Sequence, residues 1–334
     1  MVMPKVVCVG SNLESEIALK NLIANNANVI GLVTLPRGSG EGVSDYRDLH
    51  RMAKQAGIAV LDTLDINSGE TIKELRHLEA DYLFILGWSQ ILKAEALSSV
   101  SGFVVGSHPT PLPERRGRAP IPWTILDKER SSAVTLFKMS SKIDDGPILR
   151  QKWFDLPDRP TAMEVYCLAA DALGAAFLEV YQQIAFRNVR ELSQAVHPAT
   201  YRGKRSPQDG FLDFTRSADD VDTLVRAASC PYPGAYFYYK NIKVIVWKSE
   251  LYDGPERVGI SGQILAKQSE SLVVRADDDC LLLREFEVEG VKVSLSHFKL
   301  GDVLNYRVND EIHELRQRVS RLENLLRTGG VSEE

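Results

Sequence analysis

Cysteine is scarce in this chain, and the four cysteines among its 334 residues lie far apart, at Cys8, Cys167, Cys230 and Cys280. They form no CxxC pair and no cluster with histidine, so the spacing that a zinc site requires is missing. Isolated cysteines of this kind are typical of reduced thiols. We therefore expect a cytoplasmic protein that holds no metal.

Long apolar runs and a strong excess of positive charge are also missing. No stretch is long enough to cross a bilayer, and we expect no signal peptide before the first strand-like run. The formal net charge is −5, so the chain lacks the overall basicity with which proteins contact many phosphates. We expect neither a membrane nor a nucleic acid as a partner.

Two nucleotide-binding signatures are absent as well. The fingerprint G-x-G-x-x-G does not occur, which disfavours NAD. The glycine-rich segment from Arg37 to Gly42 carries no GK[ST] and is interpreted as a flexible loop.

The first half of the chain does contain a regular alternation of strand-like and helical patterns. This alternation predicts a doubly wound, mostly parallel sheet that binds ligands outside the carboxyl ends of its strands. The turn after the first strand could present helix N-terminal amides to an anion. The strand-like runs are Lys5–Val9, Val29–Thr34, Ala59–Leu61, Tyr82–Leu86 and Ala133–Met139, and the turn is Gly10, Ser11 and Asn12.

One segment, from Phe103 to Trp123, differs from the rest because it is rich in proline. His108 follows a short apolar run there, and three arginines flank Gly117. Proline fixes φ and removes a donor, so this segment predicts an ordered loop at a strand end, a common position for catalytic residues. The prolines are Pro109, Pro111, Pro113, Pro120 and Pro122.

Two other sites admit a functional and a purely structural interpretation. Trp88 could stack on an aromatic ligand, or it could be a tryptophan at the edge of the core. Asp144 and Asp145 precede a Gly-Pro pair, so they could form a solvated turn. Alternatively, one carboxylate could fold back to orient His108.

The second half predicts a small antiparallel barrel or sandwich, because short strand-like runs follow one another closely. Its tyrosines, Tyr232, Tyr236, Tyr238 and Tyr239, could line a binding face or could simply pack. We place the domains at residues 1–200 and 205–305, followed by an amphipathic helix at 308–327. That helix has a narrow apolar seam, suited either to a homodimer or to packing back on its own barrel.

Four motifs, found in order over residues 5–290, resemble enzymes that transfer a formyl group from N10-formyltetrahydrofolate. His108 to Pro120 resembles their histidine-plus-LPxxRG loop, and Asp144-Asp145-Gly146 their Asp-x-Gly signature. The segments from Arg205 to Phe214 and from Pro231 to Ala235 resemble their C-terminal domain. The resemblance implies a Rossmann-like formyltransferase domain followed by an OB-like barrel. It is nearest to formyltransferases of nucleotide-linked amino sugars.

The resemblance also implies a catalytic set of Asn-x-His with the aspartate of Asp-x-Gly. His108 and Asp144 match two of these positions, but the asparagine position is occupied by Gly106. Losing one oxyanion donor typically costs about 10²–10³ in rate. Ser107, Thr110, protonated His108 or a water could replace the donor. Otherwise the chain is a slow enzyme or a folate or sugar-nucleotide binding protein, or the residue was substituted on purpose.

Further roles follow from the resemblance and from the chemistry of amide formation. We expect His108 to shuttle the proton, while Asp144 stabilises the protonated imidazole and fixes its tautomer. No covalent intermediate is required. For the folate we expect contacts from Leu86, Gly87, Trp88, Arg116, Lys138, Ser140, Ser141 and Asp144, and for the acceptor from Gly10, Ser11, Asn12 and Thr110.

The acceptor is therefore predicted to be a nucleotide-linked amino sugar. The acidic balance and the absence of a lysine-rich loop after the second strand disfavour a polyanion as large as tRNA. Methionyl-tRNA formyltransferase, which has the same two domains, is the alternative.

Overall fold

The computed structural model describes residues 3–40, 45–194, 198–306 and 308–328. The chain divides into two compact units. The first contains residues 1–209 and 226–233, and the second contains residues 210–225 and 234–334. The short segment 226–233 thus belongs to the first unit although it follows part of the second.

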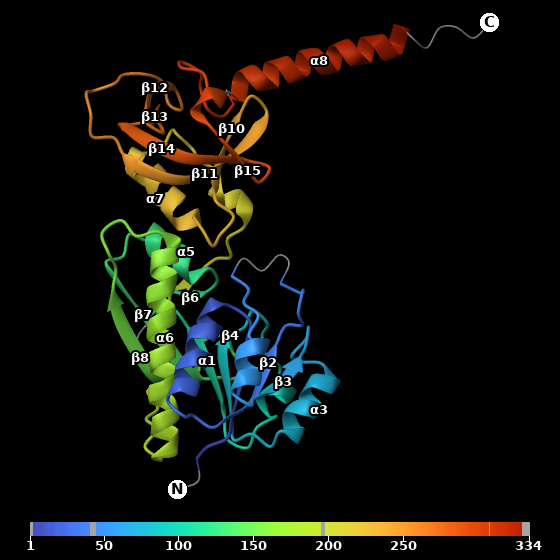
Figure 1. Ribbon diagram of the computed structural model, residues 1–334. Coiled ribbons are helices and arrows are strands. Elements are labelled where there is room, and N and C mark those ends of the chain that lie inside the picture. Colours follow the sequence, from blue (N-terminus) through green and yellow to red (C-terminus); the bar gives the residue numbers. More distant parts are fainter. Residues whose placement is uncertain (1–2, 41–44, 195–197, 307, 329–334) are drawn as a thin grey trace, which may run out of the picture. The chain divides into compact units, whose positions relative to one another are not determined.

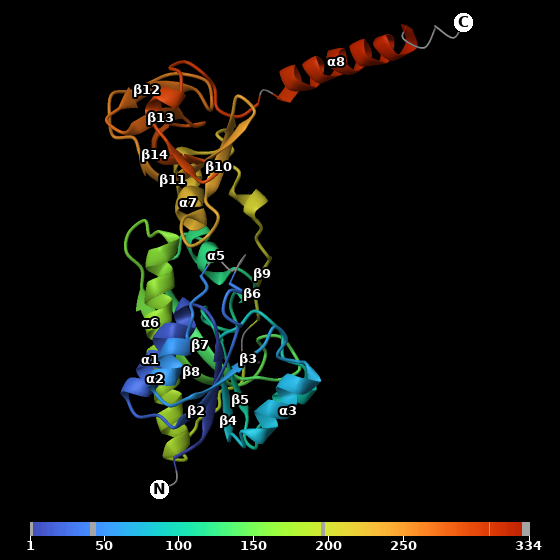
Figure 2. The same cartoon turned by 45° about the vertical axis from the view of Figure 1, so that its right-hand side comes forward.

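A seven-stranded sheet forms the centre of the first unit, in the order β3-β2-β1-β4-β5-β7-β8 (Figures 1 and 2). The pairs from β3 to β5 are parallel, whereas β7 runs antiparallel to β5 and to β8. The strands are β1 Val6–Gly10, β2 Val29–Thr34, β3 Ala59–Asp62, β4 Tyr82–Gly87, β5 Val104–His108, β7 Ser131–Lys138 and β8 Ile148–Asp155.

The predicted doubly wound, mostly parallel sheet is confirmed, and the structure adds strands to it. Strand β8 and the short pair β6 Arg116–Gly117 and β9 Tyr201–Arg202 were not predicted. Strand β7 was expected at Ala133–Met139 as part of a parallel sheet, but it is antiparallel to β5. The strand order reverses direction at β1 and β4, because β2 lies on one side of β1 and β4 on the other. Ligands of doubly wound sheets bind at such a reversal.

Helices cover both faces of this sheet. On one face, α1 and α6 pack on each other and on a core that includes Phe84 and Phe177. On the other face, a second core with Val7 and Ile72 lies beneath α3. The helices are α1 Leu13–Ala24, α2 His50–Gln55, α3 Gly69–His77, α4 Ala94–Leu97, α5 Pro120–Leu126 and α6 Ala162–Ala185. Burial on both faces explains why the central strands read as continuous apolar runs.

The first turn of α6 shows why this long helix begins where it does. The Thr161 side chain accepts from the Glu164 backbone N–H, and the Glu164 carboxylate accepts from the Thr161 N–H. This capping box satisfies two backbone donors that the helix itself leaves unpaired.

The second unit contains the predicted antiparallel sheet and ends with a separate helix. The strand order is β10-β11-β14-β13-β12, and β15 pairs with β14. Tyr236 and Tyr239 are buried in this sheet, and the Tyr239 hydroxyl donates to Asp302 at 2.7 Å, so packing accounts for both tyrosines. The elements are α7 Ala218–Ala228, β10 Ala235–Tyr239, β11 Ile242–Leu251, β12 Ile264–Gln268, β13 Ser271–Arg275, β14 Cys280–Val288, β15 Val291–Val293 and α8 Val308–Thr328, with 3₁₀ turns at Pro207–Gly210 and Leu295–His297.

No helix in the described ranges is both long enough and apolar enough to cross a membrane.

Candidate active site

His108 is the last residue of β5, at the carboxyl end of the parallel strands, and its side chain is only 8% exposed. Its Nε2 lies 3.0 Å from the carbonyl oxygen of Arg115. A carbonyl can only accept, so Nε2 carries the hydrogen in the neutral ring. Nδ1 is therefore the basic nitrogen, and it lies 3.9 Å from Oδ2 of Asp144.

Asp144 comes from the loop between β7 and β8, where its backbone is left-handed with φ of +50°. Aspartate tolerates this conformation better than most residues. Its Oδ2 also accepts from the backbone N–H of Gly117 at 3.4 Å, so the carboxylate lies between the imidazole and the proline-rich loop. The distance of 3.9 Å to the imidazole exceeds a hydrogen bond. The Arg115 carbonyl, rather than Asp144, therefore selects the tautomer.

The neighbouring aspartate has a different role. Asp145 forms one ion pair with Arg116 at 2.9 Å and another with Lys142 at 3.5 Å. Arg116 is buried, and its Nη2 also donates to the side chain of Gln194 at 2.6 Å. The two adjacent acids thus separate, with Asp144 beside His108 and Asp145 holding the basic loop.

A cavity of about 490 Å³ opens beside the His108–Asp144 pair. It contains much of the predicted site and several residues that the sequence did not suggest, notably Gln90 and Leu92. Its lining comprises Ile85, Trp88, Ser89, Gln90, Ile91, Leu92, Gly106, Ser107, His108, Gly117, Arg118, Ala119, Pro120, Phe137, Met139, Ser140, Ser141, Lys142, Ile143 and Asp144. Ile91 and Ile143 are more than half exposed. In the sequence, the only signal for Ile91 and Ile143 was a large apolar side chain in a loop that follows a strand.

Trp88 belongs to this lining, and its indole N–H donates to Gln90 at 3.3 Å. The Gln90 side chain is also bonded to the backbone of Leu64 and Ile66. Trp88 therefore offers the cavity a ring held in place by its neighbours, which suits a flat ligand.

Four of the residues predicted to contact the folate, Leu86, Gly87, Arg116 and Lys138, do not line this cavity. Leu86 is fully buried in the core, and Lys138 pairs with Glu191 at 3.3 Å. Arg116 is buried against Asp145 and Gln194. Arg118, two residues further along the chain, is exposed and lines the cavity in its place.

At Gly106, the position that corresponds to the family asparagine, neighbouring side chains leave almost no space for a larger residue. A Cβ placed on Gly106 would lie 2.7 Å from Cγ of Met139 and 2.9 Å from Cζ of Phe137. The neighbouring hydroxyls are also engaged, because Ser107 donates to the Ile85 carbonyl at 2.9 Å and Thr110 donates to the Glu114 carbonyl at 3.0 Å. Of the proposed replacements for the missing donor, Thr110 is fully buried outside the cavity lining and Ser107 is committed to the backbone.

The turn formed by Gly10, Ser11 and Asn12 connects β1 to α1 and lies against the end of β4. Oδ1 of Asn12 accepts from the Ser15 backbone N–H at 3.0 Å and from its hydroxyl at 2.6 Å, which caps α1. Gly87, with φ of +150°, lies so close that a Cβ there would be 2.4 Å from Asn12 Oδ1. The Asn12 side chain is therefore used to build the turn.

Beside this turn, acidic groups gather around the N-terminus of α1. Burial, reinforced by the nearby charge of Asp45, raises the pKa of Glu14 to about 8. The Tyr166 hydroxyl donates to Asp45 at 2.5 Å, and burial raises the pKa of Tyr166 and of Tyr232. This cluster was not predicted, because its members are far apart in sequence.

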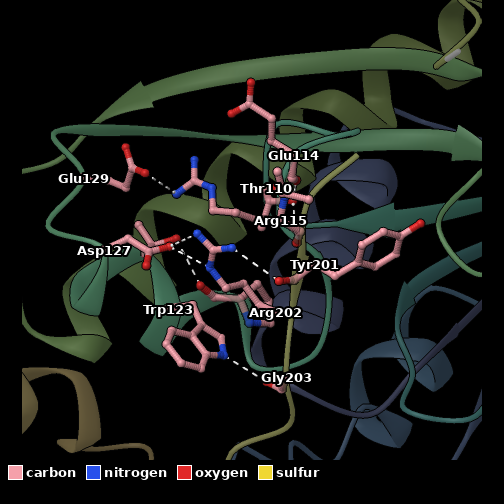
Figure 3. Close-up of polar contacts among 12 residues, drawn as sticks. Thr110, Glu114, Arg115, Trp123, Asp127, Glu129, Tyr201, Arg202 and Gly203 are labelled. Carbon is pink, nitrogen blue, oxygen red and sulfur yellow. Dashed lines mark hydrogen bonds and ion pairs between the residues drawn. The ribbon is translucent and has the colours of Figure 1, made fainter. Parts of the chain in front are cut away.

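The back of the proline-rich loop is anchored by several polar contacts (Figure 3). Arg202 binds the Asp127 carboxylate through Nε and Nη2, both at 2.9 Å. The indole N–H of Trp123 donates to the Gly203 carbonyl at 2.9 Å, and Arg115 approaches Glu129 at 3.3 Å. The backbone N–H of Arg115, whose carbonyl orients His108, donates to the Thr200 hydroxyl at 2.8 Å.

Sequence comparison identifies the family of this chain. The family model described as "Formyl transferase" matches residues 6–180, and the model "Formyl transferase, C-terminal domain" matches residues 204–298. The chain belongs to the formyl transferase family. This formyltransferase is 27% identical over 291 residues to the methionyl-tRNA formyltransferase of Rickettsia bellii, covering 86% of the chain and 93% of that relative.

Two solved structures are similar in fold. One is an N-formyltransferase from Helicobacter canadensis, in complex with folinic acid and dTDP-3-aminofucose. It has a TM-score of 0.64 and 20% identity, and the match covers 85% of this formyltransferase and all of that chain. The other is a variant of HypX from Aquifex aeolicus, with a TM-score of 0.66 and 14% identity. That match covers 92% of this formyltransferase but 51% of HypX.

Proposed function

We propose that this formyltransferase transfers the formyl group of N10-formyltetrahydrofolate to the primary amine of a nucleotide-linked amino sugar. The observation that carries the proposal is the His108–Asp144 pair at the edge of a cavity of about 490 Å³. The Helicobacter canadensis neighbour, whose structure contains folinic acid and a dTDP-linked amino sugar, supports this choice of substrates.

The pterin is placed in the cavity against Trp88, with Ser140 and Ser141 on the opposite loop as hydrogen-bonding groups. A pterin carries donors and acceptors along its edge, which suit hydroxyls and exposed backbone. Arg118 and Lys142, which also line the cavity, supply positive charge for the carboxylates of the folate tail. Arg118 thus takes the role that the sequence suggested for Arg116.

Chemistry begins when the neutral amine of the acceptor attacks the formyl carbon. A C–N bond forms, the carbonyl π electrons move to oxygen, and the amine proton passes to Nδ1 of His108. The Asp144 carboxylate, 3.9 Å away, stabilises the resulting imidazolium. The oxyanion then collapses, the bond to N10 breaks, and His108 returns the proton to N10. The products are the formamide and tetrahydrofolate.

Oxyanion stabilisation must come from elsewhere than residue 106, since glycine has no donor. Protonated His108 forms at the same step as the oxyanion, and it lines the cavity. A water is the second candidate, although Met139 and Phe137 leave it little of the space beside Gly106. This chemistry predicts a slower enzyme than one that retains the asparagine.

A turnover assay tests the proposal. Purified protein, N10-formyltetrahydrofolate and a panel of nucleotide-linked amino sugars are expected to yield tetrahydrofolate and a formylated sugar, detected by mass spectrometry. His108→Gln should lower kcat by about 10²–10⁴ while folate binding is retained. His77→Gln, on the exposed surface of α3, is the matched control. Unchanged turnover in His108→Gln would exclude the proton shuttle.

Methionyl-tRNA formyltransferase activity is the second candidate, favoured by the 27% identity to the Rickettsia bellii enzyme. The same preparation is therefore assayed with charged initiator tRNA. Formylation of the tRNA, with no sugar in the panel accepted, would replace the sugar by tRNA as the acceptor. Binding of folate without turnover of either substrate would indicate a catalytically impaired binding protein.

A further inference from the structure

Helix α8 presents an apolar seam that the rest of the described chain leaves exposed. Val308, Ile312, Leu315, Val319, Leu322 and Leu326 recur at spacings of four and three residues, and each is between 44% and 79% exposed. A row of large aliphatic side chains on one face of a helix is unfavourable in water unless another surface covers it.

The seam has the pattern of a two-stranded coiled coil. In heptad notation, the a positions are Ile312, Val319 and Leu326, and the d positions are Val308, Leu315 and Leu322. The central layers therefore combine β-branched residues at a with leucine at d. This combination favours two parallel strands over higher oligomers, because β-branched side chains pack well at a in parallel dimers.

The charges that flank the seam agree with a parallel, in-register pair. In such a dimer each g residue faces the e residue five positions later on the partner helix. These contacts are Glu311 with Arg316 and Arg318 with Glu323, and symmetry repeats each of them. All four contacts join opposite charges.

An antiparallel pair with the same apolar layers would be disfavoured by these residues. Matching a with d positions would place Ile312 opposite Leu322, and Val319 opposite Leu315. Arg316 would then face its own copy, and so would Arg318. Like charges opposed at such positions are repulsive.

We propose that α8 pairs with α8 of a second copy of this chain as a parallel, in-register coiled coil, making the protein a homodimer. We identify the partner that covers the seam as a second copy of α8. The reason is that the sequence of this one helix supplies both residues of each interchain ion pair. The helix carries four acidic and four basic residues, and this balance does not favour an anionic membrane as the partner. The proposal is independent of the acceptor substrate.

The mass of the full chain in solution tests the dimer. Light scattering coupled to size exclusion is expected to give twice the 37.2 kDa of one chain. Leu315→Glu with Leu322→Glu, both at d, should return the mass to 37.2 kDa. Gln317→Glu, at an outer f position, is the control and should stay dimeric. A monomeric native chain, or a dimer that survives the double substitution, would overturn the proposal.

Cross-linking tests the orientation, in a background with Cys167→Ser and Cys230→Ser to remove the exposed native thiols. Ile312→Cys, at an a position, should form an interchain disulfide with its own copy. Asp310→Cys, on the outer face, should not. If Ile312→Cys instead cross-links to a chain that carries Leu322→Cys, the helices are antiparallel and the in-register arrangement is wrong.

Discussion

The imidazole of His108 has its two nitrogens in different surroundings, and this difference gives the residue its expected chemistry. Nε2 is held by the Arg115 carbonyl at 3.0 Å, while Nδ1 faces Asp144 at 3.9 Å. A protonated ring gains from both neighbours, because the carbonyl accepts one hydrogen and the carboxylate attracts the added charge. The arrangement allows the ring to take up a proton and release it without turning.

Gly106 gives a second prediction at this scale. Because a Cβ there would lie 2.7 Å from Met139 Cγ, Gly106→Asn alone should lower the melting temperature and gain little activity. Gly106→Asn combined with Met139→Ala removes the closest of these contacts, leaving Phe137 Cζ at 2.9 Å, and should raise the rate of the chemical step by about 10–10². Single-turnover kinetics with bound formylfolate measure this rate. The control is Met139→Ala alone, and equal rates in the single and double variants would show that the asparagine is not the missing donor.

Glu14 predicts a pH dependence of stability. Burial raises its pKa from 4.5 to about 8, with Asp45 adding to the shift. Between these values the folded chain holds a proton that the unfolded chain has lost, so the free energy of unfolding should fall as pH rises from about 5 to 8, on the order of 3–4 kcal/mol. Chemical denaturation across this range measures it. Glu14→Gln should flatten this part of the profile.

The matched control for Glu14 is Glu16→Gln in the same helical turn, because the Glu16 side chain pairs with Arg47 at 3.3 Å on the surface. Glu16→Gln should leave the slope unchanged. Parallel profiles for Glu14→Gln and the native chain would contradict the assignment of the slope to Glu14.

At the scale of elements, the proline-rich loop shows how two nearby arginines acquire different roles. Arg116 starts the short strand β6 and is buried, whereas Arg118 is exposed and lines the cavity. Gly117 lies between them with φ of +110°, and a Cβ there would be 2.4 Å from the Arg202 carbonyl oxygen. Only glycine fits this position, and its backbone conformation interrupts the alternation that would place both arginines on one side.

These two arginines form a matched pair for mutagenesis. Arg116→Met should lower the free energy of unfolding by about 3 kcal/mol, since it leaves Asp145 and Gln194 without their buried partner. Arg118→Met should leave stability unchanged and raise KM for formylfolate. Denaturation curves and steady-state kinetics on both variants check this. The reverse pattern would return the folate contact to Arg116.

At the scale of the whole molecule, the net charge favours one class of formyl acceptor over another. The chain carries a formal charge of −5, which suits a small acceptor better than a long polyanion. The residues that line the cavity, with the His108–Asp144 pair, belong to the first unit. In the second unit, α8 is the part for which a partner is proposed.

Salt dependence distinguishes the two acceptors at this scale. A nucleotide-linked sugar with a diphosphate offers few charges, so log(kcat/KM) should fall with log salt at a slope no steeper than about −2. A tRNA that contacted the protein through many phosphates would give a much steeper slope. Initial rates between low and moderate salt, at constant pH, measure it. A steep slope with the sugar substrate would contradict the view that few phosphates are contacted.

The sequence alone was sufficient for the family, the alternating fold and the placement of His108 at a strand end, because these follow from local periodicity and from motifs a few residues long. The antiparallel direction of β7 and the presence of β8 could not be predicted, since strand direction depends on how the intervening loop returns. The acidic cluster around Glu14 was likewise missed, because Asp45 and Tyr166 meet only in the folded chain.

By itself, the sequence determined that an imidazole and a carboxylate are available in a formyltransferase framework, and that the last helix carries a narrow apolar seam. Only the tertiary structure decided which nitrogen of His108 is basic, that Met139 fills the space beside Gly106, and which arginine reaches the cavity. Each of these depends on contacts between segments distant along the chain. Such contacts are set by packing and by backbone hydrogen bonds, which leave no periodic signal in the order of residues.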